Sequence, residues 1–202
     1  MQRIAADLER FDPRWADEVA RVLSDGGVAA IPTDTVYGLV CDLSSRRGVE
    51  RLYQAKAMDR RHALAFLLPD LSGVARYAVV TNFAYRVMRR LLPGPYCIEL
   101  EATREVPRML LDRRRVVGIR VPESEFVQAL LKALGRPVLA SGANAPKSDT
   151  PLADADAIVE HYGSAVDLIV DAGPIGQVPS TVISLVGDQL EVVREGKGKL
   201  EL

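Results

Sequence analysis

A short polar interruption between two apolar runs constrains this chain more than any other feature. Residues 26–31 read Gly-Gly-Val-Ala-Ala-Ile, Pro32 follows, and Thr-Asp-Thr at residues 33–35 precedes a second apolar run that starts at Val36. This pattern predicts a strand, a sharp polar break and a second strand, because proline cannot donate a ladder hydrogen bond and short polar side chains favour turns. The break carries two hydroxyls, a carboxylate and Tyr37. It therefore predicts either a polar ligand held at the end of a strand or a plain hairpin turn.

Length and composition favour one globular unit. A chain of 202 residues is long enough for one large core, so a single domain over residues 1–202 is expected. Residues 1–7 lack the apolar core of a signal peptide, and no apolar run approaches the roughly 18 residues that cross a bilayer. We therefore expect a cytoplasmic protein with no membrane partner. Cys41 and Cys97 lack metal-ligand spacing, which favours buried reduced thiols over a disulfide or a zinc site.

The charge pattern says more than the charge total. A net charge of -1 gives no global attraction to nucleic acid. Arginine nevertheless outnumbers lysine and clusters at residues 46–47, 60–61, 89–90 and 113–115. Since the guanidinium group is the better fork for phosphate, the clusters predict local phosphate binding, although a genome-wide preference for arginine gives the same count.

Apolar periodicity predicts helices and strands that mingle along the chain, and the candidate helix caps are Asp12 before Pro13, Thr81 or Asn82, and Gly135. The expected helices cover residues 14–24, 48–57, 81–92, 106–111, 126–134 and 154–162. Besides the two strands around the break, the expected strands cover residues 63–68, 96–102, 116–122, 137–140, 168–173, 179–184 and 190–194. This order lacks the regular rhythm of a doubly wound sheet. We therefore predict an α/β fold of α+β-like character, with a twisted mixed parallel and antiparallel sheet flanked by helices.

Three further features are candidates for binding. Lys56 precedes a polar stretch, residues 58–62, which predicts either an anion site or a solvated charged turn. Arg120 stands inside an apolar strand, so its side chain must either alternate outward to solvent, the commoner case, or be held against an anion. The loop at residues 141–151 is rich in hydroxyl and amide groups, and such loops are common both at ligand sites and as plain connections. His161 is expected at the surface, near the end of a helix.

Residues 32–39, Pro-Thr-Asp-Thr-Val-Tyr-Gly-Leu, resemble the signature of the YrdC-like superfamily, the threonylcarbamoyl-adenylate synthases and their relatives. Further matches occur in the superfamily's order at residues 92–95, 118–122, 143–144, 179–182 and 193–196. The resemblance therefore covers nearly the whole chain. Residues 105–108, 166–168 and 194–198 look most like the YciO-like branch.

The resemblance implies a reaction that joins L-threonine, bicarbonate or CO2, and ATP into threonylcarbamoyl-adenylate, with release of pyrophosphate, for the modification of adenosine 37 in tRNA. Mg2+ would ride on the ATP triphosphate, and no protein-bound metal is expected. By resemblance, Lys56 and Arg60 would be catalytic. The implied nucleotide-binding residues are Lys56, Arg60, Arg61, Asn144 and Arg194. The implied threonine-binding residues are Thr33, Thr35, Arg120, Ser141, Ser180 and Thr181.

The chain departs from the synthase pattern at three places. Met58 stands where the synthases carry an arginine two residues after the lysine, and Leu67 stands where many place a histidine. Gly142 stands where their Ser-Ala-Asn loop has its hydroxyl, unless Ser141 serves instead. The alternative is therefore a YciO-like protein that binds double-stranded RNA or tRNA, and binds nucleotide without this catalysis. A third possibility is a sensor of nucleotide or amino acid.

Overall fold

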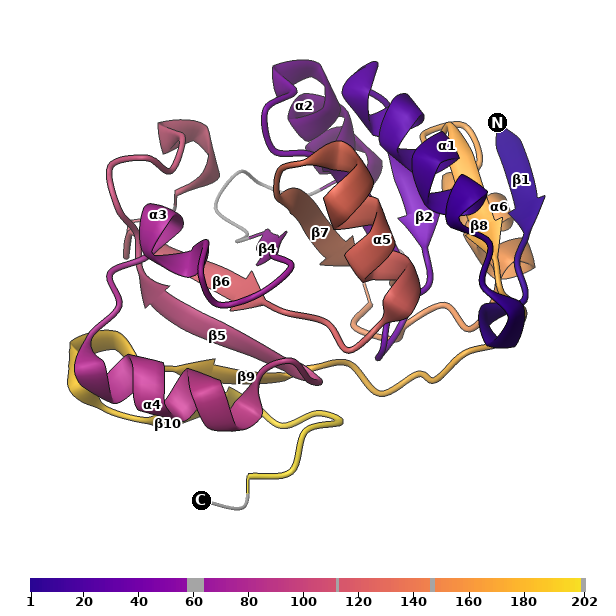
Figure 1. Cartoon of the computed structure of the whole chain (residues 1–202). Coiled ribbons are helices and arrows are strands. Elements are labelled where there is room, and N and C mark those ends of the chain that lie inside the picture. Colours follow the sequence, from indigo (N-terminus) through magenta and orange to yellow (C-terminus); the bar gives the residue numbers. More distant parts are fainter. Residues whose placement is uncertain (58–63, 112, 146–147, 201–202) are drawn as a thin grey trace.

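The computed structural model describes residues 1–57, 64–111, 113–145 and 148–200, and within these ranges ten strands form one sheet (Figure 1). The order across the sheet is β1-β8-β2-β3-β7-β4-β6-β5-β9-β10. The strands are β1 (Gln2–Ala5), β2 (Ala29–Ile31), β3 (Gly38–Asp42), β4 (Ala65–Leu67), β5 (Tyr96–Glu101), β6 (Val116–Arg120), β7 (Val138–Gly142), β8 (Leu168–Asp171), β9 (Thr181–Ser184) and β10 (Glu191–Arg194). The helices are η1 (Leu8–Arg10), α1 (Pro13–Ser24), α2 (Arg46–Ala55), α3 (Val74–Tyr77), α4 (Asn82–Leu91), η2 (Arg108–Leu110), α5 (Glu125–Leu134), α6 (Ala155–Tyr162) and η3 (Val186–Asp188).

The pairing of the strands confirms the mixed sheet that the sequence predicts. Strands β1 and β2 both run parallel to β8, β4 runs parallel to β6, and β5 runs parallel to β9. The remaining neighbours, among them β2 with β3 and β3 with β7, are antiparallel. The polar break is therefore the turn of a β2–β3 hairpin, as the simpler alternative has it. Whether that turn also binds a ligand depends on what surrounds it.

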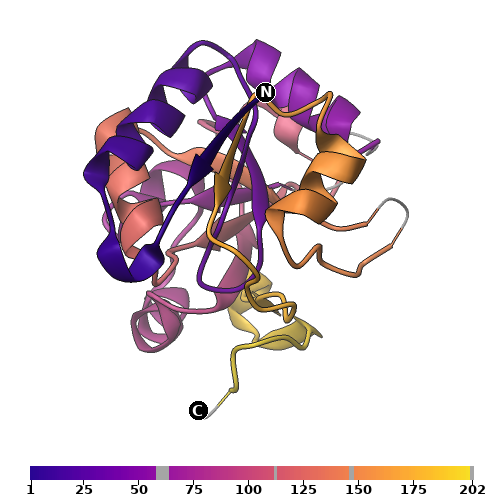
Figure 2. The same cartoon turned by 90° about the vertical axis from the view of Figure 1, so that its right-hand side faces the viewer.

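Helices cover both faces of the half of the sheet that contains β1, β8 and β2. Figure 2 shows α1 and α5 on one side of these strands and α2 and α6 on the other. One buried cluster joins α1 and α5 to the sheet through residues such as Leu23, Phe126 and Leu130. The larger cluster contains buried residues of α2, α3, α4 and α6. These two clusters pack the helices against the strands whose ends carry the polar residues.

Local capping explains where several helices begin and end. The Asp12 side chain accepts a hydrogen bond from the Arg14 N–H, and Pro13 fills the first position of α1, as the sequence predicts. Thr81 caps α4 in the same manner through the Ala84 N–H. These caps satisfy backbone N–H groups that have no partner inside the helix.

Four elements escaped the sequence prediction: β1, α3 and the short 3-10 helices η1 and η3. Strand β1 is short and mostly exposed at the edge of the sheet, so its sequence carries no alternating apolar pattern. Helix α3 has only four residues and no side-chain cap.

Cys41 is buried as expected, whereas Cys97 on β5 is only partly buried, and both are free thiols. No helix in the described ranges has the length and apolar character that would let it cross a membrane.

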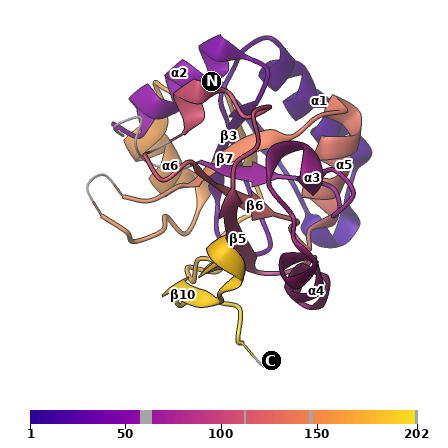
Figure 3. The same cartoon turned by 90° about the vertical axis from the view of Figure 1, so that its left-hand side faces the viewer.

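The carboxyl-terminal part of the chain lies beside β5, away from α1 and α2. Figure 3 shows β10 at the lower edge of the molecule, next to the segment that leads to the carboxyl terminus. All four residues of β10 are exposed. The chain after β10 lies at the end of β9 that meets the β2–β3 turn.

Gly135 provides a test of this local account. It ends α5 with a φ of 69°, in the left-handed region, and a Cβ there would meet nothing within 4 Å. Gly135→Ala therefore pays only a backbone cost, and we expect the free energy of unfolding to fall by about 1 kcal/mol in urea titrations. Gly73 is the matched control, because its φ is -83° and its Cβ would make an ordinary contact with Leu68. Gly73→Ala should raise stability by about 0.5 kcal/mol, and equal effects would contradict the account.

Candidate functional site

Arg120 is the buried centre of the candidate site. It lies in register with Leu67, a core residue of the cluster formed by α1 and α5, so both side chains point to that covered face. Arg120 is only 8% exposed, and its Nη2 donates to Oδ1 of Asp34 at 2.6 Å and to Oγ1 of Thr35 at 3.3 Å. Of the two alternatives for this arginine, the one in which it is held against an anion is correct, and the solvent alternative, which strand alternation favoured, is wrong. The physical reason is that the β2–β3 turn lies against Arg120 and places the Asp34 carboxylate beside it.

The same arginine has one unsatisfied donor. Its Nε is buried and has no hydrogen-bond partner among the described residues. An unpaired buried donor costs about 1–3 kcal/mol, and more when the group is charged. A ligand oxyanion bound beside Arg120 would remove this cost.

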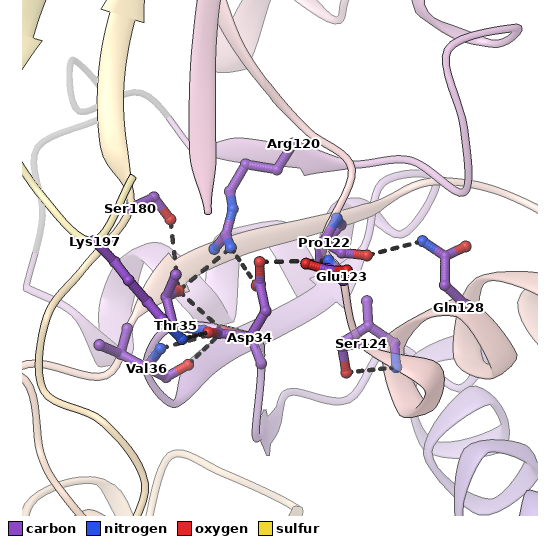
Figure 4. A network of polar contacts seen from close by, with 12 residues as sticks. Asp34, Thr35, Val36, Arg120, Pro122, Glu123, Ser124, Gln128, Ser180 and Lys197 are labelled. Carbon is purple, nitrogen blue, oxygen red and sulfur yellow. Dashed lines mark hydrogen bonds and ion pairs between the residues drawn. The ribbon is translucent and has the colours of Figure 1, made fainter. Parts of the chain in front are cut away.

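The turn between β2 and β3 is held by its own hydroxyls. Oγ1 of Thr33 accepts from the N–H groups of Thr35 and Val36 and donates to the Val36 carbonyl at 2.7 Å. Oγ1 of Thr35 lies 3.2 Å from that of Thr33 and 3.5 Å from Oγ of Ser180 (Figure 4). Thr35 and Ser180 are both buried. The turn is therefore rigid and presents hydroxyl groups next to the guanidinium of Arg120.

Strand β9 and the chain after β10 complete this side of the site. The Ser180 carbonyl accepts from Nη2 of Arg194 at 2.9 Å. The hydroxyl of Thr181 does not reach the turn, since it accepts from the Gly196 N–H and donates to the Gly198 carbonyl at 2.7 Å. Of the expected residues on or next to these strands, Ser180, just before β9, and Arg194 thus belong to the Arg120 cluster. Thr181 holds the chain after β10 instead.

Lys56 forms a second cluster at the end of α2. Its Nζ donates to the Gly142 carbonyl at 2.8 Å and to the Tyr162 hydroxyl at 3.3 Å, and it lies 5.6 Å from the centre of the Tyr162 ring. The Tyr162 hydroxyl in turn donates to the Asn144 carbonyl at 2.6 Å. Burial lowers the pKa of Lys56, while the charge of Asp149 acts in the opposite direction. Lys56 is thus a half-buried cation that is bonded to neutral groups.

The two clusters meet at the adjoining ends of β3 and β7. Gly38 opens β3 opposite Gly142, which closes β7. The Tyr37 carbonyl, at the end of the turn, accepts from the Ala143 N–H at 2.8 Å. Ser141 lies in register with Leu39, a residue of the larger core cluster, and so sits on a different face from Arg120. The backbone thus joins the turn directly to the loop that carries Asn144.

The remaining expectations lie elsewhere or outside the described residues. Arg60 and Arg61 fall in the undescribed range 58–63, as does Met58. Two cavities of about 750 Å³ lie along α5, and no expected site residue lines either of them. Within the described parts of the chain, no three His, Cys, Asp or Glu side chains gather as a metal site would require.

Sequence reasoning missed three participants: Asp34 as the partner of Arg120, Tyr162 beneath Lys56, and Lys197, whose Nζ donates to the Asp34 carbonyl at 2.5 Å. Asp34 had a usable signal. An arginine inside an apolar strand needs an anion, and Asp34 is the carboxylate in the polar break. Tyr162 and Lys197 carried no such signal, because they approach only through the tertiary fold.

Comparison with known proteins places this geometry in context. A family model for Sua5, YciO and YrdC, described as telomere recombination, matches residues 21–196. The chain is 37% identical to YciO of Escherichia coli K12, described as uncharacterized, over 93% of this chain and 92% of that protein. It is 31% identical to the threonylcarbamoyl-AMP synthase of Bos taurus, over 95% of this chain and 72% of that protein.

Solved structures agree with these sequence matches. The crystal structure of E. coli YciO superposes with a TM-score of 0.91 at 36% identity, covering 99% of this chain and 97% of that one. Sua5 of P. abyssi, in complex with L-threonine, gives a TM-score of 0.86 at 26% identity. That match covers 96% of this chain but only 57% of the Sua5 chain. The predicted fold is therefore confirmed.

The burial of Lys56 predicts a pH dependence of stability. Because its pKa is lowered in the folded chain, the unfolded chain binds more protons between that lowered pKa and about 10.4, the ordinary lysine value. The free energy of unfolding contributed by this group should therefore rise with pH in that window. Lys56→Met should remove the rise in urea titrations from neutral pH upward. Lys199→Met, at an exposed position, should keep it, and the same slope in both variants would refute the assignment.

Proposed function

We propose a function from one established premise: the chain belongs to the Sua5/YciO/YrdC family. We propose that it is a threonylcarbamoyl-AMP synthase-like enzyme of the nucleotidyltransferase type, which condenses L-threonine, bicarbonate or CO2, and ATP. The observation that carries the proposal is the buried Arg120 with its unpaired Nε, flanked by the hydroxyls of Thr35 and Ser180. A guanidinium beside hydroxyls suits a small hydroxylated amino acid.

The proposed threonine site follows from these donors. Arg120 would bind the threonine carboxylate, while Thr35 and Ser180 would hold the amino acid in a fixed orientation. Thr33 would act by fixing the turn, since its hydroxyl is engaged by the turn backbone. The complex of the related P. abyssi Sua5 with L-threonine supports threonine as the ligand class. A site whose groups are buried and hydrogen-bonded is suited to orienting a reactant before attack.

The chemical step requires charge stabilisation rather than a protein nucleophile. One oxygen of the threonine carbamate would form a bond to the α-phosphorus of ATP, the bond between that phosphorus and the bridging oxygen would break, and pyrophosphate would leave with the electron pair. Mg2+ would enter with the triphosphate as part of the substrate. Lys56 and Arg194 are the described cations proposed for the phosphates, with Arg60 and Arg61 as further candidates, and Asn144 is proposed at the nucleotide. Placing such cations ahead of the reaction lowers its barrier.

Two features of Lys56 support its proposed role. Among the described residues, its ammonium bonds to a carbonyl and a hydroxyl, and burial lowers its pKa. An incoming phosphate would add negative charge next to this ammonium, which would raise the pKa of Lys56 again. Nucleotide binding should thus be coupled to retention of the proton on Lys56.

The decisive assay measures pyrophosphate release from ATP and Mg2+ with L-threonine and bicarbonate present together or singly. We expect release only with both, and formation of labelled threonylcarbamoyl-adenylate from labelled bicarbonate. Lys56→Ala and Arg194→Ala should each lower the rate about a hundredfold, because each removes a charge-assisted contact of roughly 1–3 kcal/mol. Lys132→Ala, at an exposed position of α5, is the control and should retain the parent rate.

Absence of threonine-dependent pyrophosphate above the Lys56→Ala level would refute the synthase. If ATP still raised the melting temperature, the YciO-like alternative would stand, namely a protein that binds nucleotide and double-stranded RNA or tRNA. Exposed arginines on α4, Arg86, Arg89 and Arg90, offer phosphate contacts for that alternative. Such binding would weaken steeply as salt rises.

A further inference from the structure

Residues 195–199, which follow β10, are here termed the tail. The tail runs along β9. The Gly196 N–H donates to the Thr181 hydroxyl at 3.0 Å, and that hydroxyl donates to the Gly198 carbonyl. A Cβ on Gly196 would collide with the backbone just before Thr181, and a Cβ on Gly198 would collide with the ring of Tyr96. Any side chain at either glycine would therefore force the tail away from the sheet.

This course brings Lys197 to the turn between β2 and β3. Its N–H donates to the Pro179 carbonyl at 2.8 Å, and its Nζ donates to the backbone carbonyl of Asp34 at 2.5 Å (Figure 4). The carboxylate of Asp34 is not its partner, since that group is engaged by Arg120. The turn is thus clamped twice, by Arg120 through the Asp34 side chain and by Lys197 through the Asp34 backbone.

Lys197 has no acidic partner among the described residues. Its side chain is exposed, and among the described residues no carboxylate lies within ion-pair distance of it. An ammonium group has three donors, and the Asp34 carbonyl takes one. The contacts around the turn therefore involve three cations, Arg120, Arg194 and Lys197, but, in the described part of the chain, only two acidic residues: Asp34, whose carboxylate pairs with Arg120, and Glu123, whose N–H donates to that carboxylate.

An excess of cations around rigid hydroxyls attracts an oxyanion, and a hydrogen bond between two ionised groups is stronger than one between neutral groups. We propose that Lys197 is a further anion-binding residue of the candidate site, and that the tail is the wall that presents it. Its ammonium would keep the Asp34 carbonyl and add an oxygen of the ligand. This inference rests on the proposed function for the source of that oxygen, which is either the amino-acid carboxylate or a nucleotide phosphate.

Calorimetric titration of the full chain with two probes separates these sources. L-Threonine reports on the carboxylate and inorganic pyrophosphate on the phosphate. We expect Lys197→Ala to weaken the binding of one probe about tenfold, the value of one charge-assisted contact, and Lys197→Arg to stay within about threefold of the parent. Lys199→Ala is the matched control, because Lys199 lies on the same tail and its exposed side chain makes no hydrogen bond or ion pair with the described residues.

The outcomes are distinct. Loss of affinity for threonine alone, or for pyrophosphate alone, in Lys197→Ala supports the inference and identifies the source of the oxyanion. Equal affinities in Lys197→Ala, Lys199→Ala and the parent would overturn it, as would a parent chain that binds neither probe. The proposed function is decided separately by threonine-dependent release of pyrophosphate. A chain that shows the Lys197 effect on pyrophosphate but no such release would keep the inference and lose the synthase.

Discussion

The buried contact between Arg120 and Asp34 is the interaction on which the candidate site depends. Arg120 is buried at the end of β6, so its charge is stable there only with an anion beside it. Asp34 supplies that anion from the β2–β3 turn, with side chains only 10% and 7% exposed for the arginine and the aspartate. The pair therefore fixes the turn, and with it the hydroxyls of Thr33 and Thr35. The unpaired Nε of Arg120 remains as the place for a further oxyanion.

Sheet topology explains how residues far apart in the sequence reach this turn. Strand β3 lies beside β7, so the turn before Gly38 meets the loop after Gly142, where Lys56 is bonded. Strand β9 lies beside β5, which lies beside β6, so Ser180 reaches Thr35, a hydrogen-bond partner of Arg120. Each neighbour is a long-range pairing, and no local sequence pattern encodes it. The site is thus a property of the strand order rather than of one motif.

The sequence predicted the elements well and the contacts only in part. Asp12, Thr81 and Gly135 marked helix ends correctly because caps follow local chemistry. It also reduced Arg120 to two alternatives, but the choice depended on the β2–β3 turn, which only the tertiary fold places beside Arg120. The resemblance named Ser180, Arg194 and Lys56 as site residues. In the structure, each of them lies in one of the two polar clusters. The sequence did not predict the contacts of Tyr162 and Lys197, since only folding brings these residues to their partners.

The most direct test of this account is a double-mutant cycle on the buried pair. The free energies of unfolding of the parent, Asp34→Asn, Arg120→Met and the double variant would be measured in urea under identical conditions. Removing one partner of a buried pair leaves the other uncompensated, so each single variant should lose about 3 kcal/mol, and the double variant should lose little more. The account predicts a coupling energy of about 2 kcal/mol between the two positions. Losses that simply add would contradict it, because the turn would then be held without the arginine.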